Sequence, residues 1–326
     1  MKASSAISNK TPTPGSSASK ESAASPSSTE PPSAGSAEDI SDGTRAFGLA
    51  GPSLNLDPRV HAWRRDIADV ALAWQVISSH YARPVLRACG SRATFLWPSP
   101  EAEGDAVSEL LPGEGFAVVE YTGPWAWGYC TADHRVGYVE AIELIAPASP
   151  THIVCEAKAP VCADGSIGAT TLAMMPMGAR LTGREEGACL MSEIGCMPMS
   201  HVRPLAEPEI DPAAVAMRLI HAPYRAGGRS HLGVDASGLI QLALGLCGVN
   251  APRDLDQQRE IGEAVTGKLR RGDIVIAGEG DAMEGGIMID DLMLIHASRD
   301  MGKVKVVPAS TLEARHESSV RRRADI

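Results

Sequence analysis

Aromatic side chains are scarce in this sequence and almost missing from its second half. They make up 4% of the 326 residues; all Trp and Phe lie before Gly128, and the last aromatic after Tyr138 is Tyr224. Eleven of the twelve Met lie after Tyr138. A core of Met, Leu, Ile and Val specifies its packing less sharply than one with aromatic anchors. The second half therefore has few rings with which to wall a ligand groove.

An excess of positive charge is also lacking. The sequence has 30 Lys and Arg against 40 Asp and Glu, with a net charge of −10. Because binding to a phosphate backbone needs a basic face, we expect no nucleic-acid partner. The three consecutive arginines at 321–323 are expected to be a solvated chain end rather than a binding patch.

Long apolar runs are absent as well. A membrane span needs about 18 to 20 mainly apolar residues, so no membrane partner is expected. Residues 1–45 are rich in Ser, Ala and Pro without an apolar stretch, which predicts a disordered tail and no secretory signal. We therefore expect a cytoplasmic protein, although a different translation start would leave room for an export signal.

The seven cysteines are expected to be reduced thiols in such a compartment. Four of them form two pairs, each seven positions apart: Cys155 with Cys162, and Cys189 with Cys196. Paired zinc ligands are usually separated by about two to four residues, whereas buried thiols behave as small apolar side chains. No metal and no cofactor are expected.

Short β-like segments separated by turns dominate the middle of the chain. After a lead-in segment at 46–85, residues 86–147 predict a small barrel, and their turn and strand order resembles a bacterial SH3 domain. Residues 151–205 repeat this rhythm more faintly and predict a second, degenerate SH3-like domain. In cell-wall enzymes such modules position peptidoglycan fragments, which makes Glu114 and Tyr138 weak binding candidates.

The remaining residues, 211–326, mix helices and strands. Ala213 to Leu219 predicts a helix, and a second helix begins at Asp235 and ends near Gly248. Short strands follow at 273–276, 286–289, 292–295 and 304–307. A helix packed on an antiparallel sheet is an α+β arrangement.

Five motifs in this region resemble the NlpC/P60 family, papain-like cysteine peptidases that cut the stem peptides of bacterial cell walls. Their order and spacing follow the family's: Tyr224-Arg225-Ala226-Gly227-Gly228, Asp235-Ala236-Ser237-Gly238, Ala251-Pro252-Arg253-Asp254, Arg271-Gly272-Asp273-Ile274-Val275, and Glu284-Gly285-Gly286-Ile287-Met288 continuing to Leu294-Ile295-His296-Ala297. The resemblance implies an α+β, papain-like domain preceded by one or two small SH3-like β-barrels.

The sequence departs from the family at the positions of its catalytic residues. The nucleophilic Cys is replaced by Ala236, the catalytic His by Glu284 and a Trp by Ala226, while His296 occupies the third catalytic position. Alanine offers no nucleophile, and a carboxylate would make a neighbouring thiolate harder to form. Ser237 is a poor substitute because adjacent helical residues point about 100° apart.

The polar residues that remain in the motifs are typical of ligand binding. Tyr224, Asp235 and Ser237 align with positions that, in cytoplasmic γ-D-glutamyl-L-diamino acid endopeptidases, hold the free N-terminal alanine and D-glutamate of a muropeptide. The alternative is structural: Asp235 and Ser237 cap the helix, Tyr224 fills the core, and His296 is a hydrogen-bonded core histidine.

The resulting hypothesis is a catalytically inactive homologue that binds a peptidoglycan stem peptide or a protein partner. Two alternatives stay open at this point. One is an active hydrolase with non-standard catalytic residues, and the other is a protein–protein interaction scaffold.

Overall fold

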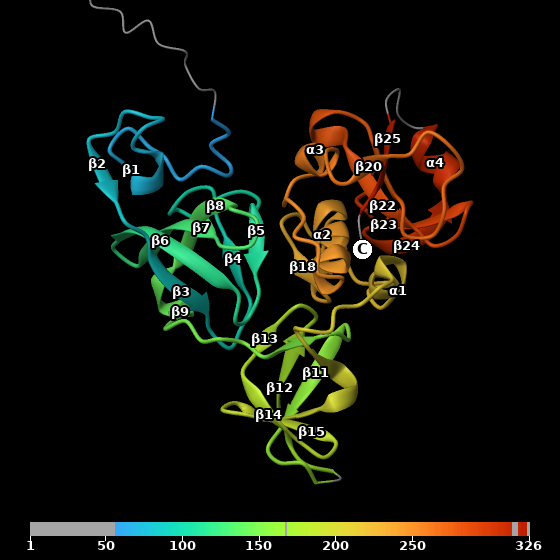
Figure 1. The fold of residues 1–326 in the computed structure, drawn as a ribbon, viewed down its shortest axis with the longest axis horizontal. Coiled ribbons are helices and arrows are strands. Elements are labelled where there is room, and N and C mark those ends of the chain that lie inside the picture. The colour runs from blue at the N-terminus through green and yellow to red at the C-terminus, as the bar shows by residue number, and fades with distance from the viewer. Residues whose placement is uncertain (1–55, 167, 315–318, 325–326) are drawn as a thin grey trace, which may run out of the picture. The chain divides into compact units, whose positions relative to one another are not determined.

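The computed structural model describes residues 56–166, 168–314 and 319–324 (Figure 1). The tail predicted at 1–45 lies outside the described residues. In the described part, no helix is long and apolar enough to cross a membrane. The α+β class is confirmed: strands dominate residues 56–204, and helices join a larger sheet in the C-terminal part.

The lead-in segment folds into two short parallel strands joined through a 3-10 helix. These are β1 (Ile67–Asp69), η1 (Val70–Leu72) and β2 (His80–Ala82). Asp69 caps η1, because its carboxylate accepts the Ala71 N–H at 2.9 Å. The same carboxylate accepts the Tyr129 hydroxyl at 2.8 Å, which ties the lead-in to the following barrel.

The first barrel has a five-stranded antiparallel sheet in the order β8-β7-β6-β3-β9 and a separate hairpin, β4-β5. Its inward-facing side chains, including Phe116 and Leu96, form their own core. The elements are β3 (Val85–Cys89), β4 (Thr94–Leu96), β5 (Ser108–Leu110), β6 (Gly115–Thr122), β7 (Trp125–Cys130), β8 (Val136–Glu140), η2 (Ala141–Glu143) and β9 (Leu144–Ile145).

Residues 152–204 form a second β unit with a core of its own, in which Met175, Met197 and Leu190 take the place of aromatic residues. Its sheets run β13-β10-β17 and β12-β11-β16-β15-β14. Its assignment as SH3-like stays a prediction. The elements are β10 (His152–Val154), β11 (Lys158–Cys162), β12 (Thr171–Pro176), β13 (Arg180–Leu181), β14 (Gly183–Glu186), β15 (Cys189–Ser192), β16 (Gly195–Pro198), η3 (Met199–His201) and β17 (Val202–Pro204).

The C-terminal part packs its longest helix, α2 (Ala236–Leu246), on a six-stranded sheet of order β20-β25-β21-β22-β23-β24. The other elements are α1 (Pro212–Met217), β18 (Arg229–Ser230), β19 (Gly233–Val234), α3 (Leu255–Gln258), β20 (Glu263–Ala264), β21 (Ile274–Ala277), η4 (Gly280–Ala282), β22 (Glu284–Met288), β23 (Met293–Ser298), β24 (Lys303–Pro308), α4 (Ala309–Glu313) and β25 (Ser319–Arg323).

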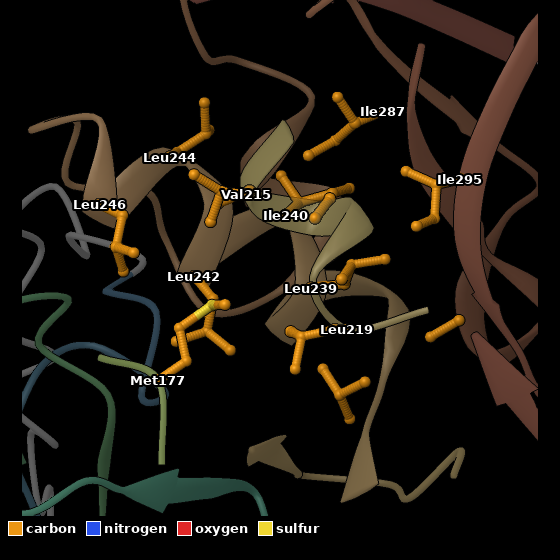
Figure 2. Close-up of a cluster of buried hydrophobic side chains, with 14 of the residues drawn as sticks. Met177, Val215, Leu219, Leu239, Ile240, Leu242, Leu244, Leu246, Ile287 and Ile295 are labelled. Atoms are coloured by element: carbon orange, nitrogen blue, oxygen red, sulfur yellow. The ribbon is translucent and has the colours of Figure 1, made fainter. Parts of the chain in front are cut away.

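The helix α2 is held by apolar contacts on nearly all sides, since every residue except Gly245 is buried. Figure 2 shows Ile240 beside Val215 of α1, on the side that faces Ile287 and Ile295 of the sheet. Met177 of the second β unit lies next to Leu242 in the same cluster. The start of α2 is therefore fixed relative to the sheet that carries the other motif residues.

The arginines at 321–323 were wrongly expected to be a solvated chain end. They belong to β25, which pairs with β20 on one side and β21 on the other. The Arg323 guanidinium donates to both carboxylate oxygens of the buried Asp273, at 2.7 and 2.8 Å. This arginine run can lie in a sheet because one of its charges, that of Arg323, pairs with the buried carboxylate of Asp273.

Candidate functional site

Asp235 caps α2 and is surrounded by hydrogen-bond donors. Its carboxylate accepts the Gly238 N–H at 2.7 Å, which satisfies a free donor of the first helical turn. It also accepts the Gly227 N–H at 2.8 Å and the Ser237 hydroxyl at 3.1 Å. The sequence predicted this cap correctly as a structural alternative.

Arg253 is the counter-charge of Asp235. Its guanidinium donates to both Asp235 oxygens, at 2.7 and 3.1 Å, and to the hydroxyls of Ser237 and Ser108. The Arg253 side chain is only 2% exposed. We call Asp235, Ser237, Arg253 and Ser108 the buried network; it fills the space beneath the helix start and links it to strand β5 of the first barrel.

A pocket of about 290 Å³ opens beside the first residue of α2. Tyr224, Ala236 and Glu284, three of the positions singled out by the sequence, come together in its wall. The full lining is Tyr224, Ala236, Asp281, Ala282, Met283, Glu284, Ala297, Arg299 and Asp300. Hereafter we call it the α2 pocket.

Tyr224 is placed by the backbone around it. Its N–H donates to Gly302 at 2.8 Å, and it forms a β-bridge with Val234 just before the helix. Three residues on, Gly227 has a φ of +73°, and a Cβ there would lie 2.2 Å from the Ala106 carbonyl oxygen. Only glycine fits this close approach of the first barrel.

Arg299 is the basic group of the α2 pocket. Its Nε donates to the Tyr224 hydroxyl at 3.1 Å, and a second nitrogen donates to the Asp281 carbonyl at 3.2 Å. With Asp281, Glu284 and Asp300, it gives the pocket charges of both signs. The arrangement suits a ligand that itself carries both carboxylate and ammonium groups.

His296 lies next to this pocket but does not line it. Neighbouring residues of a strand point to opposite faces, so Ala297 faces α2 while His296 faces the other way. His296 lines a pocket of about 190 Å³ with Ser298, Asp300 and Lys305 among others. Its Cα pairs with that of Gly286 on β22, and it is 3% exposed.

The weaker candidates from the first barrel have structural partners. The Glu114 carboxylate accepts hydrogen bonds from both terminal nitrogens of the buried Arg229, at 2.8 and 3.0 Å. The Tyr138 hydroxyl accepts from Arg64 at 2.8 Å. Beside Arg229, burial raises the pKa of Glu109, whose carboxylate accepts the Arg229 N–H at 2.6 Å. Neither candidate lines the α2 pocket.

Within the ranges that the structure describes, no group of three or more His, Cys, Asp or Glu side chains is arranged to hold a metal ion.

Sequence reasoning missed Arg299, Asp281 and Asp300 as pocket residues. A signal existed for two of them, because Arg299 and Asp300 directly follow the segment Leu294-Ile295-His296-Ala297-Ser298 that the motif comparison singled out. Asp281 had no such signal, since it comes from the 3-10 helix before β22.

The papain-like arrangement agrees with comparisons to known families. Residues 221–321 match the NlpC/P60 family, and residues 96–144 match the bacterial dipeptidyl-peptidase Sh3 domain. The C-terminal region is therefore similar to NlpC/P60 domains, and the first barrel is similar to bacterial SH3 domains.

Murein DD-endopeptidase MepS/Murein LD-carboxypeptidase of Escherichia coli K12 is 34% identical over 84 residues, which are 25% of this chain and 45% of that protein. The match thus spans less than half of the relative's length.

Solved structures extend the likeness beyond one domain. An NlpC/P60 family protein from Bacillus cereus ATCC 10987 superposes with a TM-score of 0.64 at 17% identity, over 73% of this chain and 99% of that one. An NlpC/P60 endopeptidase from Photobacterium damselae subsp. piscicida gives a TM-score of 0.50 at 12% identity, over 68% and 66%. At these identities the likeness concerns the fold.

Proposed function

We propose that the protein is a catalytically inactive NlpC/P60 homologue that binds a peptidoglycan stem peptide in the α2 pocket. One observation carries the proposal: the residues lining the pocket include no thiol, aliphatic hydroxyl or imidazole. The helix start, where the family's nucleophile would stand, presents the methyl group of Ala236. Covalent peptide hydrolysis needs an activated nucleophile and a base within reach.

The ligand class follows from the polar groups of the pocket. A stem peptide such as L-Ala-γ-D-Glu-diaminopimelate carries several carboxylates and ammonium groups. We propose that Arg299 binds a peptide carboxylate, that the Tyr224 hydroxyl donates to the peptide, and that Glu284 attracts an ammonium group.

Asp235 and Ser237 are proposed to support this binding from beneath the pocket. Their oxygens are occupied by Arg253 and by the first turn of α2, so a ligand ammonium would compete with a buried guanidinium for Asp235. Their proposed contribution is to fix the helix start and thereby the pocket wall.

His296 is proposed to be a structural histidine. It lines the neighbouring pocket and not the α2 pocket. Glu284 lines the α2 pocket, and none of the described residues lining it offers an aliphatic hydroxyl or thiol for a carboxylate to activate.

Inactivity is tested by incubating the full chain with L-Ala-γ-D-Glu-diaminopimelate tripeptide and following it by mass spectrometry. We expect the tripeptide to remain intact. Cleavage that survives further purification and is lost in Glu284→Gln would overturn the inactive assignment. It would instead support a hydrolase with non-standard catalytic residues.

Binding is tested by calorimetry with the same tripeptide. We expect measurable heat for the natural chain and about tenfold weaker affinity, ~1.4 kcal/mol, for Arg299→Ala. Arg184→Ala is the matched control, because that side chain is 83% exposed on β14. Absence of heat, or equal weakening by both variants, would contradict the proposed ligand and favour a scaffold role.

We also propose a cytoplasmic location. All seven cysteines carry free thiols, and three of them lie on adjacent strands of one sheet. Such thiols persist in a reducing compartment. Cell fractionation with an antibody against the chain tests the location; recovery outside the cytoplasm would refute it.

A further inference from the structure

Three thiols gather in the second β unit, far from the α2 pocket along the chain. Cys162, Cys196 and Cys189 lie on β11, β16 and β15, which are consecutive neighbours in one sheet. The sequence pairing of Cys155 with Cys162 is not kept, because Cys155 belongs to the core around α2. The cluster therefore could not be read from spacing.

The three thiols share one face of the sheet. Cys162 and Cys196 are directly opposed, and Met191 is also opposed to Cys196. Cys189 lies two residues from Met191, and side chains two apart in a strand point to the same side. The intervening Leu190 and Met197 point into the core instead. The thiol face is thus the outer face.

The sulfur atoms of Cys189 and Cys196 lie close together on this face. A Cβ built on Gly165 would lie 3.1 Å from the Cys189 sulfur and 3.7 Å from the Cys196 sulfur. Cys162 and Cys189 are half-buried, whereas Cys196 is 1% exposed. Small oxidants can reach the outer two thiols, and the third lies beneath them.

The register of the paired strands determines which two cysteines can form a disulfide. Directly opposed residues of antiparallel strands have Cα atoms about 4.5 to 5.5 Å apart, within the range for a disulfide. Diagonal neighbours are about 7 to 8 Å apart, at or beyond its limit. Cys162 and Cys196 are opposed, while Cys189 is diagonal to Cys196.

We propose that Cys162 and Cys196 are a reversible oxidation site that forms a disulfide with a peroxide as oxidant. The Cys162 sulfur attacks hydrogen peroxide, breaks the O–O bond, becomes a sulfenic acid and releases one water. The Cys196 sulfur then attacks the sulfenic sulfur. Its proton leaves with the hydroxyl group as a second water, and the S–S bond forms.

The environment of Cys196 assigns it the second step. Burial and a hydrogen bond with the Cys189 thiol raise the pKa of Cys196 to about 11. It therefore forms little thiolate near neutral pH and is a poor first nucleophile.

The disulfide is tested on the full chain. The reduced protein is treated with hydrogen peroxide, alkylated, digested and analysed by mass spectrometry. We expect one cross-linked peptide joining Cys162 to Cys196, and a thiol count under denaturing conditions that falls by two from seven. Dithiothreitol should restore the count.

Variants make the assignment specific. Cys196→Ser and Cys162→Ser should each abolish the cross-link, while Cys189→Ser and the control Cys247→Ser should retain it. Alkylating the exposed thiols of the native, natural chain before peroxide should also block it, which keeps the test valid if a variant fails to fold. A Cys189–Cys196 link, or oxidation to sulfinic acid without any link, would overturn the proposal.

Discussion

The two sides of the start of α2 differ sharply in chemistry. On the inner side, Asp235, Ser237 and Arg253 form a buried network in which the Asp235 carboxylate accepts from backbone and side-chain donors. On the pocket side, Ala236, the first residue of the helix, presents only a methyl group. The difference shows that the buried network holds the start of this helix without any contribution from the side chain of its first residue.

The largest effect is expected from breaking the buried network. Arg253→Met leaves the Asp235 carboxylate largely buried without its counter-charge. Removing one partner of a buried ion pair costs about 3 to 5 kcal/mol. We expect a loss of this size in the free energy of unfolding, measured by urea denaturation of the full chain.

The matched control is Arg299→Met, which makes the same replacement in the α2 pocket. Arg299 is a surface cation, so its loss should cost less than about 1 kcal/mol. The double variant Arg253→Met with Asp235→Asn should recover part of the stability, because no unpaired charge is left behind. Equal losses for Arg253→Met and Arg299→Met would erase the distinction between the two sides.

A second prediction restores a thiol to the pocket side. In Ala236→Cys, the helix N-terminus lowers the thiol pKa while the Glu284 carboxylate raises it. Adding Glu284→Gln should therefore lower this pKa by about one unit, or ~1.4 kcal/mol. The measurement is the pH dependence of alkylation at position 236, followed by mass spectrometry.

Ala282→Cys is the control for that experiment. Ala282 lines the same pocket but is exposed in the 3-10 helix before β22. Its thiol should respond less to Glu284→Gln, since solvent screens an exposed charge pair. If the thiol introduced at 236 did not respond at all, Glu284 would not face the helix start as we propose.

Local signals in the sequence were enough to predict the helices and strands that form the α2 pocket. The helices expected at 213–219 and from Asp235 are α1 and α2, and the four strands expected after them are β21 to β24. Capping and apolar periodicity act over a few residues, and they can be read directly.

The partners of the site residues could not be read in this way. Asp235 pairs with Arg253, which is 18 residues away, and Arg253 reaches Ser108 across 145 residues. Likewise, Arg323 meets Asp273 across 50 residues, so a run of arginines that looked like a solvated end became a strand. Pairing over such separations is decided by tertiary packing, which no local pattern records.

A third prediction concerns a more exposed ion pair, between Asp57 and Arg59. Asp57 accepts from Arg59 and from Gln257 of α3, and the hydrogen bond from Arg59 chiefly lowers its pKa from 3.8 to about 2. A lowered carboxyl pKa gives stability that is present above about pH 4 and is lost as the pH falls toward 2. Asp57→Asn should remove this dependence.

The size of that effect is limited by solvent. The Asp57 side chain is 31% exposed, so we expect less than about 1 kcal/mol between pH 4 and pH 2. Urea denaturation at both pH values, for the natural chain and for Asp57→Asn, measures it. A larger change would mean that this ion pair behaves like the buried network.

The smallest effect is expected from Arg184→Ala on β14. Arg184 donates to Glu186 on the same strand, and the two side chains are 83% and 45% exposed. Because both ions keep most of their hydration, their attraction is offset by the entropy of holding two long side chains. We expect a change in the free energy of unfolding within about 0.5 kcal/mol. A loss comparable to that of Arg253→Met would show that exposure does not separate the strong ion pairs of this protein from the weak ones, and the contrast drawn at the start of α2 would then need another cause.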